Sequence, residues 1–161
     1  MSDEVLATAE ASAARRWLGI GMLAAIGGLV IYVAFSSPPS LGWQVFLVAM
    51  GVGALWMAVR MRRATESQIV LTEQGLHDAS GIEIARVEDI VSLDRGFFAF
   101  KPSNGFMIRT RSAAGRVWRP GLWWRMGRRI GVGGVVPGYQ AKNMAEILAA
   151  MLAMRDQKGA G

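Results

Sequence analysis

The chain has 161 residues, 52% of them hydrophobic and 19% charged, with a formal net charge of +6 and no cysteine. The lack of cysteine excludes disulfides, thiolate nucleophiles and cysteine-ligated zinc or iron–sulfur centres within this chain. Outside its longest apolar stretch and the N-terminal segment, roughly 95 residues remain, enough for one small folded domain.

Charge is unevenly distributed along the second half of the chain. Residues 64–95 contain seven acidic and two basic residues, a net of −5, whereas residues 96–145 contain nine basic and no acidic residues, a net of +9. A basic segment of this kind indicates an anionic partner. Beside a membrane the nearest anionic partner is a lipid headgroup.

Residues 1–14 are small, polar and mildly acidic, and we expect them to form a frayed N-terminal tail. A cleavable signal peptide is the alternative. It fits poorly, because Asp3, Glu4 and Glu10 replace the basic n-region and the apolar stretch that follows is longer than the usual ~7–15 residues.

From Trp17 to Val59 the chain carries no Asp, Glu, Lys or Arg. This stretch is about twice as long as the apolar segment that one membrane-spanning helix needs. Pro38-Pro39 divides this stretch, so residues 15–63 predict a hairpin of two transmembrane helices, over 17–35 and 41–59. Arginines flank both ends and the connecting loop is uncharged, so the positive-inside rule predicts cytoplasmic termini. No ionisable residue lies inside, which argues against a transporter.

Both predicted helices carry small residues four positions apart, and such pairs let helix backbones approach closely. The helix-packing residues are Ala24 with Gly28 and Ala49 with Gly53. In one interpretation the two helices of the hairpin pack on each other through these residues. In the other, the residues support a homo-oligomer or dock onto a larger membrane protein complex.

Residues 64–161 predict a cytoplasmic domain of short antiparallel strands followed by one helix. Apolar runs separated by turns rich in Gly, Ser and Pro favour strands at 68–72, 76–78, 82–86, 87–94, 97–101, 106–111 and 116–119. Residues 112–115 are interpreted as a turn. Apolar residues then recur at three- and four-residue steps over residues 140–156, which predicts an amphipathic helix that covers the sheet.

This order of elements resembles the membrane-anchored bacterial PH-like domain proteins. After the two-helix hairpin, the resemblance is carried by Ile69-Val70-Leu71-Thr72 with Gly75-Leu76, and by Gly81-Ile82-Glu83-Ile84 with Ile90. It implies a mainly-β PH-like barrel or sandwich closed by a C-terminal amphipathic helix. It also implies a non-enzymatic protein of the bacterial inner (plasma) membrane. Residues 120–134, rich in Trp, Arg and Gly, depart from the family pattern.

No arrangement of side chains predicts catalysis. His77 is the single histidine, so no second histidine exists for a metal site, and its neighbour Asp78 would face the opposite side of a strand. We interpret His77 as a surface residue near a turn. Residues 131–134 are glycine-rich but lack the Lys-Ser/Thr of a phosphate-binding loop, so we interpret them as a strand end. A solvated acidic face is the interpretation for Glu83, Glu88, Asp89 and Asp94. We therefore expect no enzymatic activity, no catalytic residue, no cofactor and no metal.

The strongest local signal lies between residues 116 and 129, where tryptophan and arginine residues are interspersed. Tryptophan rings favour the headgroup region, and each nearby arginine contributes about 1 kcal/mol at an anionic surface. The predicted membrane- or partner-binding residues are Arg116, Trp118, Arg119, Trp123, Trp124, Arg125, Arg128 and Arg129. The opposing interpretation places the tryptophans in the core and the arginines on a solvated face. Nucleic acid is not expected, because a membrane-tethered domain meets lipid first.

The sequence thus predicts an inner-membrane anchored binding or scaffold protein whose cytoplasmic PH-like domain contacts anionic lipid headgroups or a partner protein. The alternative is an accessory or assembly subunit of a larger membrane complex that docks through the hairpin.

Overall fold

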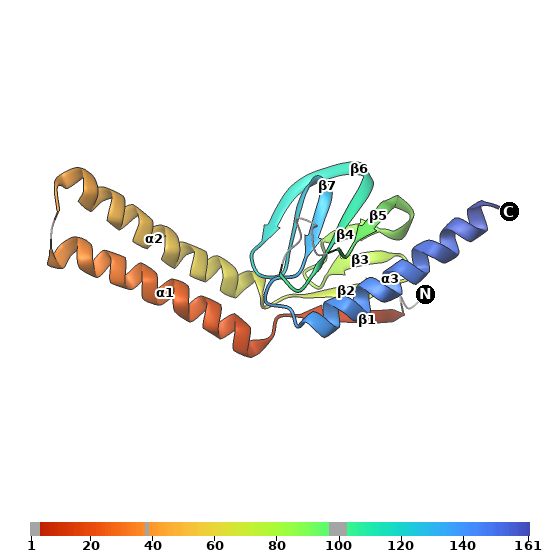
Figure 1. Ribbon diagram of the computed structural model, residues 1–161, viewed down its shortest axis with the longest axis horizontal. Coiled ribbons are helices and arrows are strands. Elements are labelled where there is room, and N and C mark those ends of the chain that lie inside the picture. The colour runs from red at the N-terminus through yellow and green to blue at the C-terminus, as the bar shows by residue number, and fades with distance from the viewer. Residues whose placement is uncertain (1–3, 38, 97–102) are drawn as a thin grey trace. The chain divides into compact units, whose positions relative to one another are not determined.

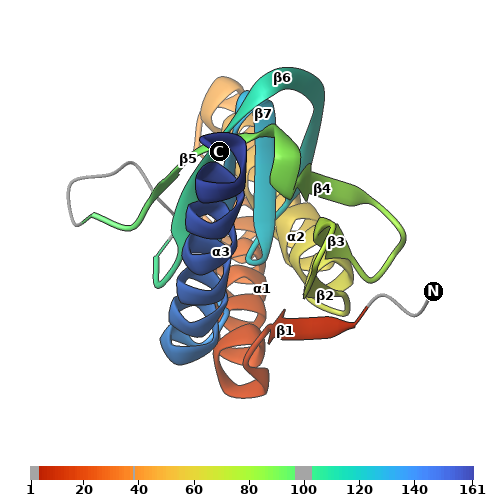
Figure 2. The ribbon, with the colours of Figure 1, turned by 90° about the vertical axis from the view of Figure 1, so that its right-hand side faces the viewer.

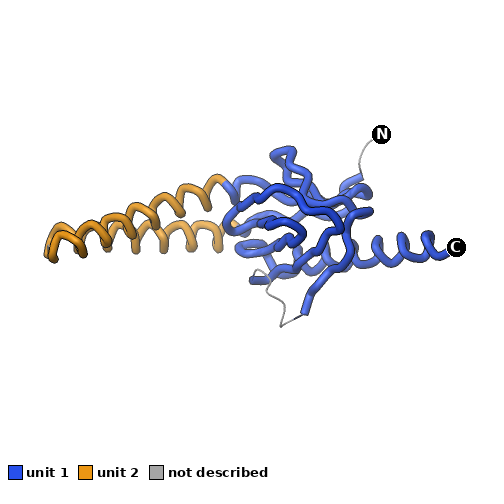
Figure 3. The backbone as a smooth tube through the Cα atoms, turned by 90° about the horizontal axis from the view of Figure 1, so that it is seen from above, with its two compact units in different colours: residues 1–12, 64–161 blue, residues 13–63 orange. Residues whose placement is uncertain are grey.

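A computed structural model describes residues 4–37, 39–96 and 103–161, which form two compact units (Figures 1 and 3). One unit is a helix pair, residues 13–63, and the other joins the chain up to Ser12 to the chain from Ala64 onward. Pro38 and the predicted strand at 97–101 lie outside the described residues.

The helix pair consists of α1 (Ala13–Ser36) and α2 (Leu41–Ala64), which confirms the two predicted helices and lengthens each by about a turn. Both helices are apolar on their exposed surfaces as well as on the faces that meet. Exposed large side chains include Leu18, Met22, Ile26, Leu29, Val45, Phe46, Met50 and Val52. Both helices are long and apolar enough to cross a membrane.

The two helices meet through glycines other than the predicted ones. A Cβ placed on Gly27 would lie 2.9 Å from the Gly51 carbonyl oxygen, and one placed on Gly51 would lie 2.9 Å from the Gly27 oxygen. The predicted residues Ala24, Gly28, Ala49 and Gly53 are all exposed. Nothing lies within 4 Å of a Cβ at Gly28 or Gly53. The interpretation that the hairpin packs through those four residues is therefore wrong.

The larger unit contains two antiparallel sheets that are not closed into a barrel. Sheet A has the order β1 (Val5–Glu10), β2 (Gln68–Thr72), β3 (Gly75–Asp78) and β4 (Glu83–Arg86). A 3-10 turn, η1 (Val87–Asp89), leads into sheet B, which has the order β5 (Ile90–Asp94), β6 (Phe106–Arg119) and β7 (Trp123–Val132).

The segment expected to be a frayed tail is strand β1, so that expectation is wrong. Ala9 lies opposite Ile69 of β2, and both side chains are completely buried. The Glu10 amide also donates a hydrogen bond to the Gln140 side-chain oxygen at 3.0 Å. The domain therefore includes residues before the helix pair, and the helix pair is an insertion between two paired strands.

Helix α3 (Gly138–Gly159) closes the core, as predicted from its periodicity. Its buried residues follow three- and four-residue steps: Ala141, Met144, Ala145 and Leu148. Figure 2 shows α3 in front of the sheets. These side chains join one core with both sheets, which contribute Ile69, Leu71, Leu76, Ile90, Phe106, Ile108, Ile130 and Val132.

Strands β6 and β7 pair as a long antiparallel ribbon that is strongly curved (Figure 1). Strand β6 continues through residues 112–115, which were predicted as a turn, with register shifts on both sides of Ala114. The tip of the ribbon meets its base, because the Gly133 amide donates to the Leu122 carbonyl at 2.9 Å. Gly127 adopts a φ of 64°, a conformation that favours glycine and accompanies a bulge.

Candidate functional site

The curl of the ribbon separates the predicted binding residues into different environments. Trp123 is only 1% exposed, and its indole Nε1 donates a hydrogen bond to Asp78 Oδ2 at 2.7 Å. The prediction that Trp123 contacts a membrane or partner is therefore wrong, because its ring lies in the core. For this tryptophan the opposing interpretation is confirmed.

Asp78 is a fully buried carboxylate that ties sheet A to the start of β7. Besides the Trp123 indole, it accepts hydrogen bonds from the Ser67 hydroxyl and, at 2.9 Å, from the Ser80 amide. Burial alone would raise the pKa of Asp78, but these hydrogen bonds outweigh it and hold the pKa below its ordinary value. Arg119 Nε lies 3.9 Å from Asp78 Oδ2, so this predicted binding residue is partly committed to the core network.

Arg125 and Trp124 hold the curled ribbon together. Arg125 Nη1 donates to the carbonyls of Glu83 at 2.9 Å and Ile84 at 3.2 Å, which lie on the open edge of β4. Its Nε donates to the Gly115 carbonyl at 2.9 Å. Trp124 is half-buried, and its indole lies where any side chain at position 131 would project, so Gly131 is required there.

The remaining predicted residues form the accessible part of the stretch. Trp118 is 46% exposed and lies opposite Trp124 in the β6–β7 register. The other exposed members are Arg116, Arg128 and Arg129.

The strand register adds two residues that the sequence analysis did not select. Arg109 of β6 lies directly opposite Arg129 of β7, and Ser92 of β5 lies opposite Arg109 on its other side. All three are exposed. Within the described part of the chain, neither arginine makes an ion pair. We call these three residues the arginine row. Like charges directly opposite each other in a sheet are destabilising unless an anion lies between them.

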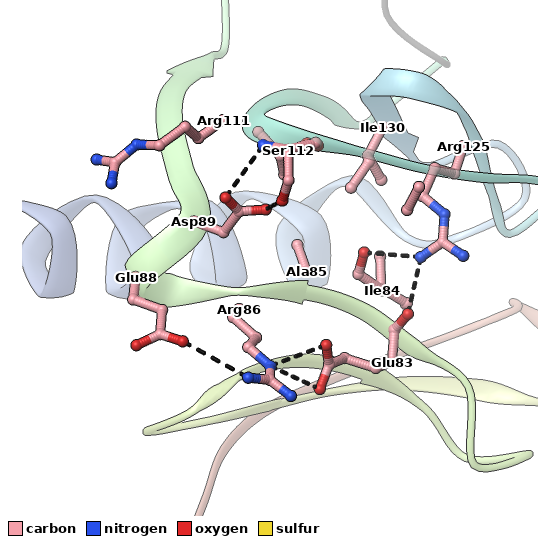
Figure 4. Close-up of a pocket in the computed structure, with 12 residues that line it drawn as sticks. Glu83, Ile84, Ala85, Arg86, Glu88, Asp89, Arg111, Ser112, Arg125 and Ile130 are labelled. Atoms are coloured by element: carbon pink, nitrogen blue, oxygen red, sulfur yellow. Dashed lines mark hydrogen bonds and ion pairs between the residues drawn. The ribbon is translucent and has the colours of Figure 1, made fainter.

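A groove of about 480 Å³ lies between β4 and the ribbon, and Figure 4 shows its lining. Three acids interpreted as a solvated face gather here. Arg86 Nε lies 3.0 Å from Glu83 Oε1, which raises the pKa of Arg86, and Arg86 Nη1 lies 3.6 Å from Glu88 Oε1. The Ser112 hydroxyl lowers the pKa of Asp89 below its ordinary value. The acidic side chains of the groove are therefore paired with Arg86 or Ser112, whereas the two arginines of the arginine row have no such partner among the described residues.

Across residues 4–37, 39–96 and 103–161, no three His, Asp or Glu side chains gather closely enough to hold a metal ion. His77 lies opposite Val70 in the middle of sheet A. No protein-family model, curated protein or solved structure matches the chain. Two long apolar helices are inserted into a domain of two antiparallel sheets and a C-terminal helix.

Proposed function

We propose that this protein is a membrane-anchored binding module. In this proposal the helix pair spans a bilayer and the two-sheet domain contacts anionic lipid headgroups. The order of four strands, three strands and a final helix supports a PH-like domain, as the family resemblance implies.

The pairing of β1 with β2 supports a two-pass topology. These strands precede and follow the helix pair, yet Glu10 lies opposite Gln68 in one sheet. Both flanking segments must therefore lie on the same side of any membrane that the chain crosses, which an even number of crossings satisfies. Arginines at both bases of the helix pair (Arg15, Arg16, Arg60, Arg62 and Arg63) favour the cytoplasmic side of a bacterial inner membrane.

The arginine row is the observation that carries the proposed lipid contact. Arg109 and Arg129 are opposite, exposed and without an acidic partner in the described residues. A phosphate oxygen between them relieves the repulsion, and the Ser92 hydroxyl supplies a further donor. At about 1 kcal/mol for each arginine, two arginines favour the lipid-bound domain by roughly 2 kcal/mol, or about 30-fold.

The absence of cysteine allows a direct test with the full chain in lipid nanodiscs. A polarity-sensitive fluorophore is attached at Val91→Cys, an exposed position beside Ser92. Quenching by a nitroxide-headgroup lipid is compared between phosphatidylcholine nanodiscs and nanodiscs that also contain phosphatidylglycerol. We expect stronger quenching with phosphatidylglycerol, reversed by salt.

Two double variants that lose the same charge distinguish an effect of the arginine row from an effect of the net charge of the domain. Arg109→Gln with Arg129→Gln should abolish the response to phosphatidylglycerol. Arg116→Gln with Arg128→Gln should retain most of it, because both residues lie outside the row. A probe that never responds to phosphatidylglycerol would reject the lipid function. If the chain instead co-purified with one soluble protein in a fixed stoichiometry, the domain would bind a partner protein and not lipid.

The alternative function, a subunit that docks onto a larger membrane complex, is favoured by the exposed small residues of the helix pair. Ala24, Gly28, Ala49 and Gly53 face outward, and the space above both glycines is open. Gentle detergent extraction should then recover the chain in one large stoichiometric complex, and Gly28→Ile with Gly53→Ile should release it. Recovery as a lone monomer contradicts this alternative.

A further inference from the structure

Both connections between the domain and the helix pair leave the same end of sheet A. Glu10 and Gln68 are paired there, Ala11 and Ser12 join β1 to α1, and residues 65–67 join α2 to β2. At ~3.3–3.6 Å for each extended residue, these connections reach at most about 12 Å. We call this end of the domain the link end. In the proposed function, this is the end of the domain from which the chain enters and leaves the bilayer.

Hydrogen bonds fix which other segments of the domain lie at the link end. The Ser12 amide donates to the Val135 carbonyl at 3.0 Å, and the Ala79 amide donates to the Gln68 carbonyl at 2.8 Å. Asp78, bound by Ser67, holds Trp123 and thereby the tip of the β6–β7 ribbon. The link end therefore contains the β3–β4 turn, the ribbon tip and the segment that leads into α3.

Two exposed aromatic side chains emerge from these segments. Trp118 precedes Arg119, which lies at the ribbon tip beside Asp78, and Trp118 is 46% exposed. Tyr139 is 73% exposed and is followed by Gln140, whose side-chain oxygen accepts the Glu10 amide. Among the described residues of this unit, Trp118 and Tyr139 are the exposed large aromatics. They gather at one end of the domain although they come from different elements.

Tryptophan and tyrosine are amphipathic rings that concentrate at the boundary between water and the bilayer. We propose that the link end is a bilayer-interface surface, in which the Trp118 and Tyr139 rings lie in the headgroup region and fix how the domain rests on the membrane. This proposal depends on the membrane spanning of the proposed function. It does not depend on anionic lipid, because the insertion of these rings is driven by their apolar area.

The chain contains two tyrosines, which permits a test at the ring itself. In the full chain with Tyr32→Phe, incorporated fluorotyrosine reports on Tyr139 alone by ¹⁹F NMR. The protein is placed in neutral phosphatidylcholine nanodiscs. We expect its signal to be broadened by a nitroxide-headgroup lipid and protected from a water-soluble paramagnetic chelate.

A matched control places the reporter at the opposite end of the same sheet. Glu73 is exposed in the turn between β2 and β3, roughly 17 Å along β2 from the link end. With Tyr32→Phe and Tyr139→Phe, a fluorotyrosine at Glu73→Tyr should show the reverse pattern, sensitive to the chelate and insensitive to the lipid. This control separates insertion of the ring from general proximity to the nanodisc.

Trp118→Gln tests whether the two rings act together. About 50 Å² of ring surface removed from water, at ~25 cal/mol per Å², corresponds to roughly a tenfold ratio of docked to undocked domain. The variant should therefore make Tyr139 more accessible to the chelate by about that factor. A Tyr139 signal as accessible to the chelate as Glu73→Tyr overturns the proposal. If the Val91→Cys probe still responds to phosphatidylglycerol, the proposed function survives that outcome. Failure of the chain to enter nanodiscs rejects both.

Discussion

Replacement of Trp123 by phenylalanine tests whether the hydrogen bond to Asp78 joins the two sheets. The substitution removes the indole donor from a buried carboxylate, and hydrogen bonds to charged groups contribute about 1.5–3 kcal/mol. The smaller ring also leaves a void in the core, which costs about 1–2 kcal/mol more. We therefore expect Trp123→Phe to lower the free energy of unfolding of the domain by about 3–5 kcal/mol.

The measurement is a urea titration of the full chain in mild detergent, read by pulse proteolysis. Trp118→Phe is the matched control, because this exposed ring makes no buried hydrogen bond in the described structure, and it should cost less than about 0.5 kcal/mol. A double-mutant cycle with Asp78→Asn should show a coupling of about 1–2 kcal/mol. Equal losses for the two tryptophan variants, or strict additivity in the cycle, would refute the assigned role of Trp123.

Three further predictions concern the same scaffold. The lowered pKa of Asp78 means that its stabilisation is complete above the unfolded pKa of about 3.9 and is lost as pH falls through the folded value. Asp78→Asn should therefore flatten the decline in urea midpoint on acidification, and an unchanged acid limb would contradict this. Gly51→Val should disrupt helix pairing, measured as a changed crosslinking pattern between α1 and α2, whereas Gly53→Val should not; equal effects would contradict the contact at Gly51. A fragment of residues 64–161 should aggregate because it lacks β1, whereas a chain with residues 13–63 replaced by a short turn should fold in solution. A monodisperse, protease-resistant fragment would show that β1 is dispensable.

Apolar patterning in the sequence predicts the elements whose apolar residues are large. The charge-free stretch gives α1 and α2, and the three- and four-residue steps give α3 to within about a turn. The sequence did not predict strand β1 because its inward residues are Ala7 and Ala9, whose small side chains give only a weak apolar alternation. Its partner β2 lies beyond two helices, so no local pattern marks the pairing.

The candidate site was predictable in composition but not in arrangement. The sequence showed that both helices carry pairs of small residues, but not which of these residues face the other helix. The contacting glycines are Gly27, next to the predicted Gly28, and Gly51, two residues before the predicted Gly53. The Trp–Arg stretch was likewise visible. Its division into core, ribbon contacts and surface depends on the curl and register of β6 and β7, which are set by non-local pairing and by glycine conformations.

The insertion of the helix pair between β1 and β2 couples the two units during folding. Residues 11–67 separate the paired strands, but the helices meet near their bases, where a Cβ on Gly19 would lie 2.8 Å from the Met61 methyl. Once the helices pack, pairing of β1 with β2 closes a short connection in place of a long loop. Loop-closure entropy then favours the strand pairing by about 2 kcal/mol more than with unpacked helices. Gly51→Val, which is remote in sequence from every strand, should therefore also make β1 more accessible to protease. Unchanged protection of β1 would show that the strands pair independently of helix packing.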